Sequence, residues 1–463
     1  MKKDNCIVVG GGICGIFSAI LLADKFTHVY LIEKDDECGG LLKSVQDANG
    51  NIYDQGTHVP NNTFIPEIDE ILFGNKSLQD ENWSNLGKPR TGNFFCGQWN
   101  LIHQMLDVRN LPEHIYQKGI VELLSITKES KAKDLVTFLI ETLGPTFTQE
   151  AVAPIAKKLY GKDVDLTQLT KDSSVGYFGL SRVLALVPEV AKKLKELPLF
   201  DTKLTYHNEK DFEERIEKDG ETNSQFQYYY PKNNKGVGFW VEFMISQAKA
   251  KGVKFLTGEY VSAINYQDDV IHTIDLGKSG EQLPCDYLWW TAPPILALKA
   301  ANIKVEPRKV SFRSACIFHF TVDKPLLNNS AYYLWNWDEN YKAFRITLYP
   351  NMQKNTLTKG YKVTAEVLCS HSETENVSLS DIFEELKEIE IIAQDAKILG
   401  ELKQVIHNTF PVTTFEMSEA IEDHYNTLTS AFNNIHLAGR FSGKNWFHHD
   451  VLKSAYKDIK QLF

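Results

Sequence analysis

The stretch CIVVGGGICGIFSAILLADKFTHVYLIE, residues 6–33, decides the fold of this chain. It opens with four apolar residues typical of a buried strand, and glycines follow at positions 10, 12 and 15. The segment after the glycines has the apolar spacing of a helix, and HVYLIE is a second apolar strand. The order of strand, glycine turn, helix and strand predicts a unit that binds a dinucleotide.

Each residue of this pattern has a separate physical task. Gly10 allows a tight turn, Gly12 lets the backbone approach a pyrophosphate, and Gly15 lets the helix pack closely against the strand. The helix N-terminus supplies free amide hydrogens and the positive end of a dipole for the phosphates. Glu33 ends the second strand 23 positions after Gly10, where a carboxylate is expected to bind a ribose hydroxyl.

The same apolar run follows MKK and therefore has the look of a signal peptide or a short membrane span. We expect neither, because no small-residue cleavage signal follows it cleanly. The run also ends at the charged residues Asp24 and Lys25. The sequence thus predicts no stable membrane span.

Composition argues against several other classes of protein. Hydrophobic residues make up 43% of the 463 residues, which is typical of a globular chain and not of a disordered or fibrous one. The formal net charge is -10, so we expect no nucleic acid as a partner. Seven scattered cysteines without a CxxC pair predict neither a disulfide framework nor a zinc site, and a reducing, cytoplasmic location is the simplest expectation.

The residues after Glu33 indicate which dinucleotide is bound. The segment KDDECGGLLKS carries the glycine pair Gly39 and Gly40, and IYDQGTHVP follows a few residues later. This order resembles the FAD-binding start of the flavoprotein superfamily that contains amine oxidases, protoporphyrinogen oxidases and UDP-galactopyranose mutases. The resemblance implies FAD as the cofactor, with the glycine pair near its phosphates.

The resemblance also assigns a segment to the isoalloxazine ring. The family's DxGxH pattern runs beside that ring, and Asp54, Gly56 and His58 match it here. The arginine that usually follows the glycine pair is absent, because Leu41 and Leu42 stand in its place. This departure weakens the link to the amine oxidase branch in particular.

Segments in the middle of the chain extend the resemblance. YYYPKNNKGVG at 228–238 is similar to the family's YP(K/R)xGxG segment, and a helix pattern and strand patterns follow it. In the family, a valine of that region meets the adenine edge, which implies Val261. DYLWWTAPP at 286–294 resembles the point where family chains cross from the cofactor domain to the substrate domain.

The end of the chain carries a second strong signal. NIHLAGRFSGKNWFHHDVLKSAYKDIKQL predicts a strand, a Gly-Arg turn, a loop and a C-terminal helix that starts near Asp450. It is similar to the closing motif of UDP-galactopyranose mutases, in which the helix N-terminus points at the flavin. The resemblance assigns to the cofactor the residues Gly439, Arg440, Asp450 and Val451, with Trp446 as the aromatic residue of the motif.

The motif departs from the mutases at Lys444, where they have a tyrosine, and at the pair His448 and His449. Adjacent histidines can bind a metal ion. No carboxylate or cysteine with ligand spacing lies near them in the sequence, however, so no metal is expected.

A nucleotide sugar needs cations that hold its diphosphate, and the planar donor fork of arginine does this best. Arg345 in YKAFRITLY resembles the FxR strand of the mutases, and Arg182 in GLSRVLAL resembles a helix arginine of the same branch. With His58 they are the candidate catalytic residues. The plain alternatives are surface ion pairs for the arginines and a hydrogen-bonded loop position for the histidine.

Together these patterns predict an α/β protein with a Rossmann-like, mostly parallel FAD-binding sheet, an antiparallel substrate sheet and a helical subdomain. We expect the FAD-binding domain to be discontinuous and to consist of residues 1–63, 231–295 and 431–463. Residues 64–230 are expected to be mainly helical, and residues 296–430 to form the antiparallel sheet.

The predicted function is chemistry at flavin N5 on a small-molecule substrate, with a nucleotide-linked sugar such as a UDP-sugar as the leading class. The reaction is either the isomerisation of the mutases or redox chemistry on a sugar nucleotide. The chain has no second GxGxxG, so NAD(P)H, as a candidate reductant, must reach the flavin at the substrate site. Two alternatives stay open: an oxidoreductase acting on an amine, porphyrinogen or polyene, and a flavin-binding protein without catalytic activity.

Overall fold

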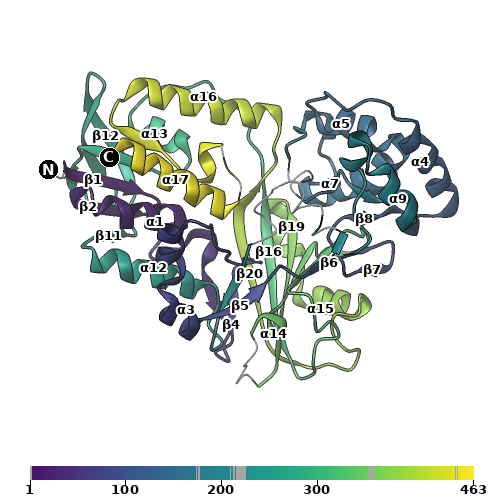
Figure 1. Cartoon of the computed structure of the whole chain (residues 1–463). Coiled ribbons are helices and arrows are strands. Elements are labelled where there is room, and N and C mark those ends of the chain that lie inside the picture. The colour runs from purple at the N-terminus through teal and green to yellow at the C-terminus, as the bar shows by residue number, and fades with distance from the viewer. Residues whose placement is uncertain are drawn as a thin grey trace.

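The computed structural model describes residues 3–173, 175, 178–208, 210–211, 214, 226–353, 359–443, 445 and 447–463. Lys444 and Trp446 of the closing motif lie outside these described residues. Figure 1 shows a first sheet with both chain termini at one end of the molecule, a group of helices at the other end, and long strands of a second sheet between them.

Five parallel strands form the first sheet, in the order β11-β2-β1-β15-β21. Every neighbouring pair is parallel, which confirms the predicted Rossmann-like α/β fold. Segments far apart in the sequence thus lie side by side. The strands are β1 (Lys3–Val9), β2 (Phe26–Glu33), β11 (Lys254–Thr257), β15 (Tyr287–Trp290) and β21 (Ile435–Leu437).

Alternating side chains of β1 enter two different cores. Cys6 and Val8 pack against helices, and Ile7 and Val9 face the opposite side of the sheet. Because both faces are covered there, residues 6–9 of the strand are all apolar, whereas its first three residues are polar and not fully buried. The first face carries α1 (Ile13–Leu22), α12 (Gly238–Ala250) and α17 (His448–Leu462). The second carries β12 (Val261–Gln267), β13 (Val270–Leu276), β14 (Gln282–Pro284), α13 (Pro294–Ala300) and α16 (Phe415–Ala431).

The second sheet has seven strands in the order β20-β16-β19-β18-β17-β6-β7. It is mostly antiparallel, as expected for the substrate side, but β17 pairs with β6 in parallel. Helix α15 (Leu379–Glu388) packs on one of its faces. The strands are β6 (Thr91–Phe95), β7 (Gln98–Asn100), β16 (Phe312–Val322), β17 (Tyr333–Asn336), β18 (Arg345–Leu348), β19 (Tyr361–Cys369) and β20 (Ile398–Pro411).

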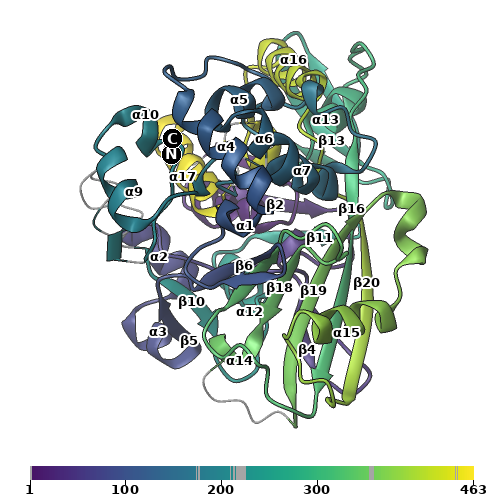
Figure 2. The same ribbon diagram turned by 90° about the vertical axis from the view of Figure 1, so that its right-hand side faces the viewer.

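A group of helices covers the other face of this sheet, as Figure 2 shows. It contains α4 (Glu113–Ser125), α5 (Leu135–Leu143), α7 (Ala153–Tyr160) and α9 (Pro188–Leu194). The segment 64–230 also contributes β5 (Trp83–Gly87), β10 (Tyr228–Pro231) and the edge strands β6 and β7, beyond the mainly helical content expected of it. Conversely, helix α16 packs against the first sheet, although it lies within 296–430, the segment expected to form the antiparallel sheet. Among the described residues, no helix has the length and apolar character needed to cross a bilayer.

Candidate functional site

The glycine turn after β1 forms an open cradle. Gly10 has a φ of 105°, and its N–H donates to Ile32 at 2.8 Å. A Cβ at Gly15 would lie 1.9 Å from the carbonyl oxygen of Gly10, so this glycine permits the close contact of helix and strand. A Cβ at Gly12 would meet no atom within 4 Å. The backbone at Gly12 therefore borders free space, as a pyrophosphate site requires.

Glu33 already bonds two backbone groups of neighbouring loops. Its Oε2 accepts a hydrogen bond from the N–H of Gly11 at 2.6 Å, and its Oε1 accepts one from Asp35 at 3.0 Å. The carboxylate thus fixes the glycine turn to the end of β2. Its contact with a ribose hydroxyl stays a prediction.

The second glycine pair lies against the first glycine turn. The N–H of Gly39 donates to the carbonyl of Gly11 at 2.8 Å, and a Cβ at Gly40 would come within 3.5 Å of Gly12. Gly39 adopts a φ of 128°, which a residue with a side chain rarely adopts. The two glycine segments predicted to contact the cofactor phosphates are therefore adjacent in space.

Asp54 is buried and bound by donors of the protein itself. Its carboxylate accepts hydrogen bonds from the hydroxyl of Tyr230 at 2.5 Å and the N–H of Val237 at 2.6 Å, and its own N–H donates to Tyr349 at 2.8 Å. Burial raises the pKa of Asp54 to about 6, although these hydrogen bonds oppose the shift. In the structure this residue holds the YYYPKNNKGVG segment against β4 (Ile52–Asp54), and a direct role toward the cofactor stays a prediction.

Gly56 brings the DxGxH turn against an ion pair of the second sheet. A Cβ at Gly56 would lie 2.8 Å from Oε2 of Glu366. Glu366 accepts two hydrogen bonds from the guanidinium of Arg345, at 2.7 and 2.6 Å, and two from the N–H and hydroxyl of Thr57, at 2.9 and 2.8 Å. Burial opposes the ionisation of Glu366, but Arg345 and Thr57 lower its pKa overall.

Two histidines and a second arginine complete this group. Burial, followed by the charge of Arg345, lowers the pKa of His58 to about 4. Burial lowers the pKa of His448 to about 3, and His449, then His58 and Arg440, add to the effect. Both histidines are therefore neutral near pH 7. Arg440, whose pKa is lowered by burial and by Arg345, adds a second cation.

The group formed by Arg345, Glu366, Arg440, His58 and His448 is named the arginine cluster below. It contains two arginines, one ionised carboxylate and two histidines that are neutral near pH 7. The Nε2 atom of His448 is buried without a hydrogen-bond partner among the described residues. Such a cluster favours an anionic or electron-rich ligand.

The closing motif connects the arginine cluster to the glycine cradle. Gly439 has a φ of 83°, and a Cβ there would lie 3.4 Å from the carbonyl oxygen of Thr291 and 3.8 Å from the sulfur of Cys14, a residue of α1. The hydroxyl of the same residue, Thr291, limits the space at Gly10. The chain then continues directly into Arg440.

Helix α17 begins two residues before the predicted position. Asp450 lies in its first turn, and Val451 packs into the core below α1. Val451 can therefore face a ligand only with its backbone, and contacts of either residue with the cofactor stay predictions. The histidine pair at the start of this helix lies against aromatic rings of Trp240, Phe226 and Phe447. Across the described residues, no group of three or more histidine, cysteine or acidic side chains could hold a metal ion.

Two predicted residues lie away from the cluster. Arg182 belongs to the helical part, where its Nη1 donates to the carbonyl of Asp201 at 2.7 Å. Val261 begins β12 and pairs with Leu276 of β13. Within the described part of the chain, no hydrogen bond or ion pair links Arg182 or Val261 to Arg345, and their predicted roles stay predictions.

Sequence reasoning missed Glu366 and His448 as members of the cluster. Glu366 lies in the stretch KVTAEVLC, which is otherwise buried strand. A carboxylate in an interior strand is rare unless it is paired, so its burial pattern is the signal that points to it. His448 gives no such signal, because its position depends on where the last helix starts.

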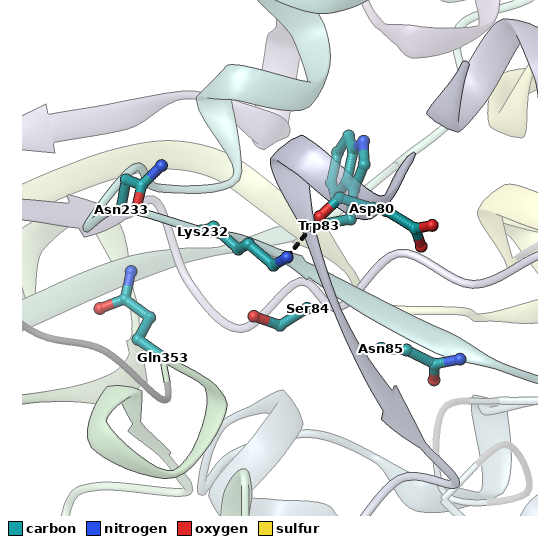
Figure 3. A pocket seen from close by; sticks show the side chains of 7 residues that line it. All are labelled: Asp80, Trp83, Ser84, Asn85, Lys232, Asn233 and Gln353. Atoms are coloured by element: carbon teal, nitrogen blue, oxygen red, sulfur yellow. Dashed lines mark hydrogen bonds between the residues drawn. The ribbon is translucent and has the colours of Figure 1, made fainter. Parts of the chain in front are cut away.

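Two cavities lie outside the arginine cluster. The smaller, of about 380 Å³, lies beside β5 and the turn at Lys232, whose ammonium donates to the main-chain carbonyl of Asp80 (Figure 3). The larger, of about 780 Å³, lies beside α12 and β11 and is lined by Lys43, Lys235 and Lys249 among others. Their described linings contain none of the residues predicted to bind the cofactor or to act in catalysis.

Comparison with known proteins supports the dinucleotide site. Residues 8–68 match the family described as an NAD(P)-binding Rossmann-like domain. The FAD-dependent oxidoreductase dbaF of Emericella nidulans is 36% identical over 94 residues, which are 20% of this chain and 20% of that protein. The 4,4'-diapolycopene oxygenase of Methylomonas sp is 36% identical over 98 residues, 20% of this chain and 19% of that protein. The chain thus matches about a fifth of the length of these curated relatives.

Solved structures resemble the whole chain at low sequence identity. Reduced UDP-galactopyranose mutase is 17% identical with a TM-score of 0.74, and the match covers 100% of this chain and 94% of the mutase. A putative protoporphyrinogen oxidase from Exiguobacterium sp. 255-15 is 14% identical with a TM-score of 0.66, covering 100% and 99%. The chain therefore shares the fold of these two proteins, as its motifs predicted.

Proposed function

We propose that the chain binds FAD and is an enzyme that acts at flavin N5 on a small molecule, with a nucleotide-linked sugar as the substrate class. The observation that carries the proposal is the arginine cluster. It gathers Arg345 and Arg440 with neutral histidines at the point where the Gly56 turn and the start of α17 meet. Perturbed titratable groups that converge at one point are typical of functional sites.

The residues present fit FAD. The open backbone at Gly12 and the uncapped start of α1 offer amide hydrogens to a pyrophosphate, and Gly39 and Gly40 close the same space from the other side. Glu33 lies at the end of β2 to meet the ribose. When bound, FAD supplies N5, an atom that accepts a hydride or attacks an electrophilic carbon.

The chain's own residues orient the reactants and control charge. Arg345 and Arg440 place positive charge where negative charge develops, and Glu366 fixes the direction of the Arg345 guanidinium. His58 is neutral near pH 7, so it can donate or accept a hydrogen bond without adding a cation. Asp54 and Tyr230 hold the surrounding loop.

The guanidinium of Arg345 supports a substrate with a diphosphate. Glu366 occupies Nε and Nη2 of Arg345, and the described residues give no hydrogen-bond partner to its Nη1, which leaves this donor for an anion. The likeness in fold to reduced UDP-galactopyranose mutase supports a UDP-sugar. Isomerisation with no net redox change is then the leading reaction, and NAD(P)H is a candidate source of electrons for activating the flavin.

A second candidate is an oxidoreductase that acts on an apolar substrate such as a polyene or porphyrinogen. Trp335 and Trp337 stack at 4.9 Å, and Phe178 lies 4.5 Å from Trp335, which borders Arg345 at 5.5 Å. Both indole N–H groups donate to Gln104. This aromatic wall, and the partial match to 4,4'-diapolycopene oxygenase, favour a water-excluding pocket.

The first test is the absorbance of the purified protein, alone and after incubation with FAD. We expect an oxidised flavin spectrum with one FAD per chain. A folded protein that takes up no FAD overturns the proposal.

Thermal shift with UDP-sugars, amines and polyenes then separates the substrate classes, because a ligand of the native state raises the apparent stability. We expect UDP-sugars to raise the melting temperature, and Arg345→Ala to remove this shift while the flavin content stays unchanged. Arg308→Ala, which breaks exposed ion pairs with Glu419 and Asp423, is the matched control and should keep the shift. A shift that survives in Arg345→Ala removes this residue as the diphosphate ligand.

Product analysis with UDP-galactopyranose decides between isomerisation and oxidation. We expect turnover only after reduction by dithionite, with no continuing consumption of the reductant. Stoichiometric oxidation of an apolar substrate instead supports the second candidate.

A further inference from the structure

Two buried cysteines touch on neighbouring strands of the second sheet. The Sγ atoms of Cys316 in β16 and Cys369 in β19 are 3.4 Å apart, and the two residues are 0% and 4% exposed. The register pairs Ser314 with Cys369 and Cys316 with Val367, so the cysteines are diagonal neighbours on one face of the sheet. This face is the one under α15, and the other face of β19 carries Glu366.

The two thiols are not equivalent. The Sγ of Cys316 donates to the carbonyl of Thr374 at 3.6 Å, and Lys403 donates to the same carbonyl at 2.8 Å. A hydrogen bond from Cys369 lowers the pKa of Cys316 against the effect of burial, and the charge of Lys403 adds to it. The same contact, together with burial, raises the pKa of Cys369. Cys316 therefore ionises first and is the better nucleophile.

A short, exposed segment lies over the pair. It is the 3-10 helix η6 (His371–Asn376), which follows β19 directly and packs on β16, β19 and β20. Five of its six residues are exposed, and Thr374 is the buried one. The hydrogen bonds of a 3-10 helix have poor geometry, and short exposed elements open locally at low cost in free energy. Opening of η6 therefore gives a small solute access to Cys316.

We propose that Cys316 and Cys369 form a reversible disulfide when the protein meets hydrogen peroxide. The Cys316 thiolate attacks one peroxide oxygen, the O–O bond breaks, and a sulfenic acid and hydroxide result. The Cys369 thiol then attacks the sulfenic sulfur, forms the S–S bond and expels the hydroxyl as water. The two thiols lose two electrons and two protons in total, and one peroxide is reduced to two waters.

The register explains why the bond is reversible. Diagonal neighbours of an antiparallel pair lie farther apart than the backbone separation that a relaxed disulfide prefers. The cross-link therefore pulls β16 and β19 toward each other, and strained disulfides of this kind are readily reduced by small thiols. This site is separate from the proposed flavin chemistry and does not depend on it.

Intact-mass measurement of the native full-length protein before and after hydrogen peroxide tests the proposal. We expect a loss of two hydrogen atoms, the loss of two alkylatable thiols after denaturation, and recovery of both with dithiothreitol. Peptide mapping of the wild-type protein should show the peptides of Cys316 and Cys369 joined, a readout that needs no variant. No cross-linked peptide, or oxidation of Cys316 to a sulfinic acid without a cross-link, overturns the proposal.

Variants assign the roles of the two sulfurs. Cys369→Ser should stop at the sulfenic acid of Cys316, which dimedone traps, whereas Cys316→Ser should leave Cys369 unmodified. Cys285→Ser, at another buried cysteine, is the matched control and should form the disulfide like the wild type. Dimedone labelling of Cys369 in Cys316→Ser reverses the assigned order of attack and contradicts this part of the proposal.

Discussion

Arg345 and Glu366 face each other directly across strands β18 and β19, and one guanidinium donates to both oxygens of the carboxylate. Because Glu366 also accepts from Thr57, this pair joins the second sheet to the turn that follows β4. The relationship fixes the distance between the Gly56 turn and the arginine cluster. The ion pair between Arg345 and Glu366 therefore holds the site together and also contributes to its electrostatic field.

Replacing Glu366 by Gln should destabilise the protein strongly. The side chain of Glu366 is 4% exposed, and the change leaves the guanidinium of Arg345 without its counter-charge in a buried setting. Breaking a buried pair from one side costs about 3–5 kcal/mol. Urea unfolding measures the loss, and Glu384→Gln, at an exposed pair with Lys387, is the control with an expected effect below about 0.5 kcal/mol. Equal losses of unfolding free energy in the two variants would contradict the stabilising role of the pair between Arg345 and Glu366.

Alanine at Gly12 should impair FAD binding, whereas alanine at Gly15 should lower the stability of the fold. A Cβ at Gly12 enters free space, so the protein should keep its stability and lose FAD binding if the pyrophosphate lies there. A Cβ at Gly15 meets the Gly10 carbonyl at 1.9 Å, so this variant should lose roughly 1–3 kcal/mol of folding free energy, or more. Flavin content and unfolding midpoints of the two proteins check this. Normal FAD content in Gly12→Ala would show that the pyrophosphate does not lie at Gly12.

Stability should fall in acid in part because of His319. Burial lowers the pKa of His319 from 6.5 to about 4 in the folded protein. The unfolded chain therefore takes up the proton first as the pH drops. The contribution of His319 to the free energy of unfolding is complete above pH 6.5 and is lost as the pH falls towards 4. The total is roughly 3 kcal/mol. Unfolding free energies at several pH values should fall less steeply in His319→Gln, and parallel curves for the two proteins would argue against this assignment.

Replacing Tyr230 by Phe should loosen the segment that follows it. The hydroxyl of Tyr230 donates to the buried carboxylate of Asp54, and its removal leaves an acceptor short of a donor. We expect a loss of about 2 kcal/mol and a further rise in the pKa of Asp54, which this hydrogen bond lowers. Thermal or chemical unfolding measures the loss. Tyr266→Phe, at an exposed tyrosine, should change stability by less than about 0.5 kcal/mol.

The sequence was sufficient for the first two strands of the first sheet and the helix between them because their signals are local. The strand, the glycines of the cradle and the helix follow one another within residues 3–33, and a Cβ at Gly15 would meet the Gly10 carbonyl of the same motif. The closing motif was equally readable, since its strand, turn and helix are contiguous. Local patterns of this kind determine an element without knowledge of the rest of the chain.

The rest of the site depends on contacts between distant residues. Glu366 and Thr57 lie 309 positions apart, and no spacing rule relates them. Arg182 and Arg345 have the same side chain, yet the fold places Arg182 against Asp201 in the helical part. Strand β20 lies at the edge of the second sheet, and its half-exposed polar residues do not show the alternation of a strand with one buried face.

The position of β21 in the first sheet has a consequence for biosynthesis. β21 pairs only with β15 in that sheet, and the Gly439–Arg440 turn that reaches the glycine cradle follows it immediately. At 5–20 residues per second, the ribosome releases β21 roughly 20–80 s after β2. Until then the nascent chain carries an unpaired edge at β15 and only part of its nucleotide site. We therefore expect prosthetic-group loading to follow translation, and chaperones to shield that edge in the meantime.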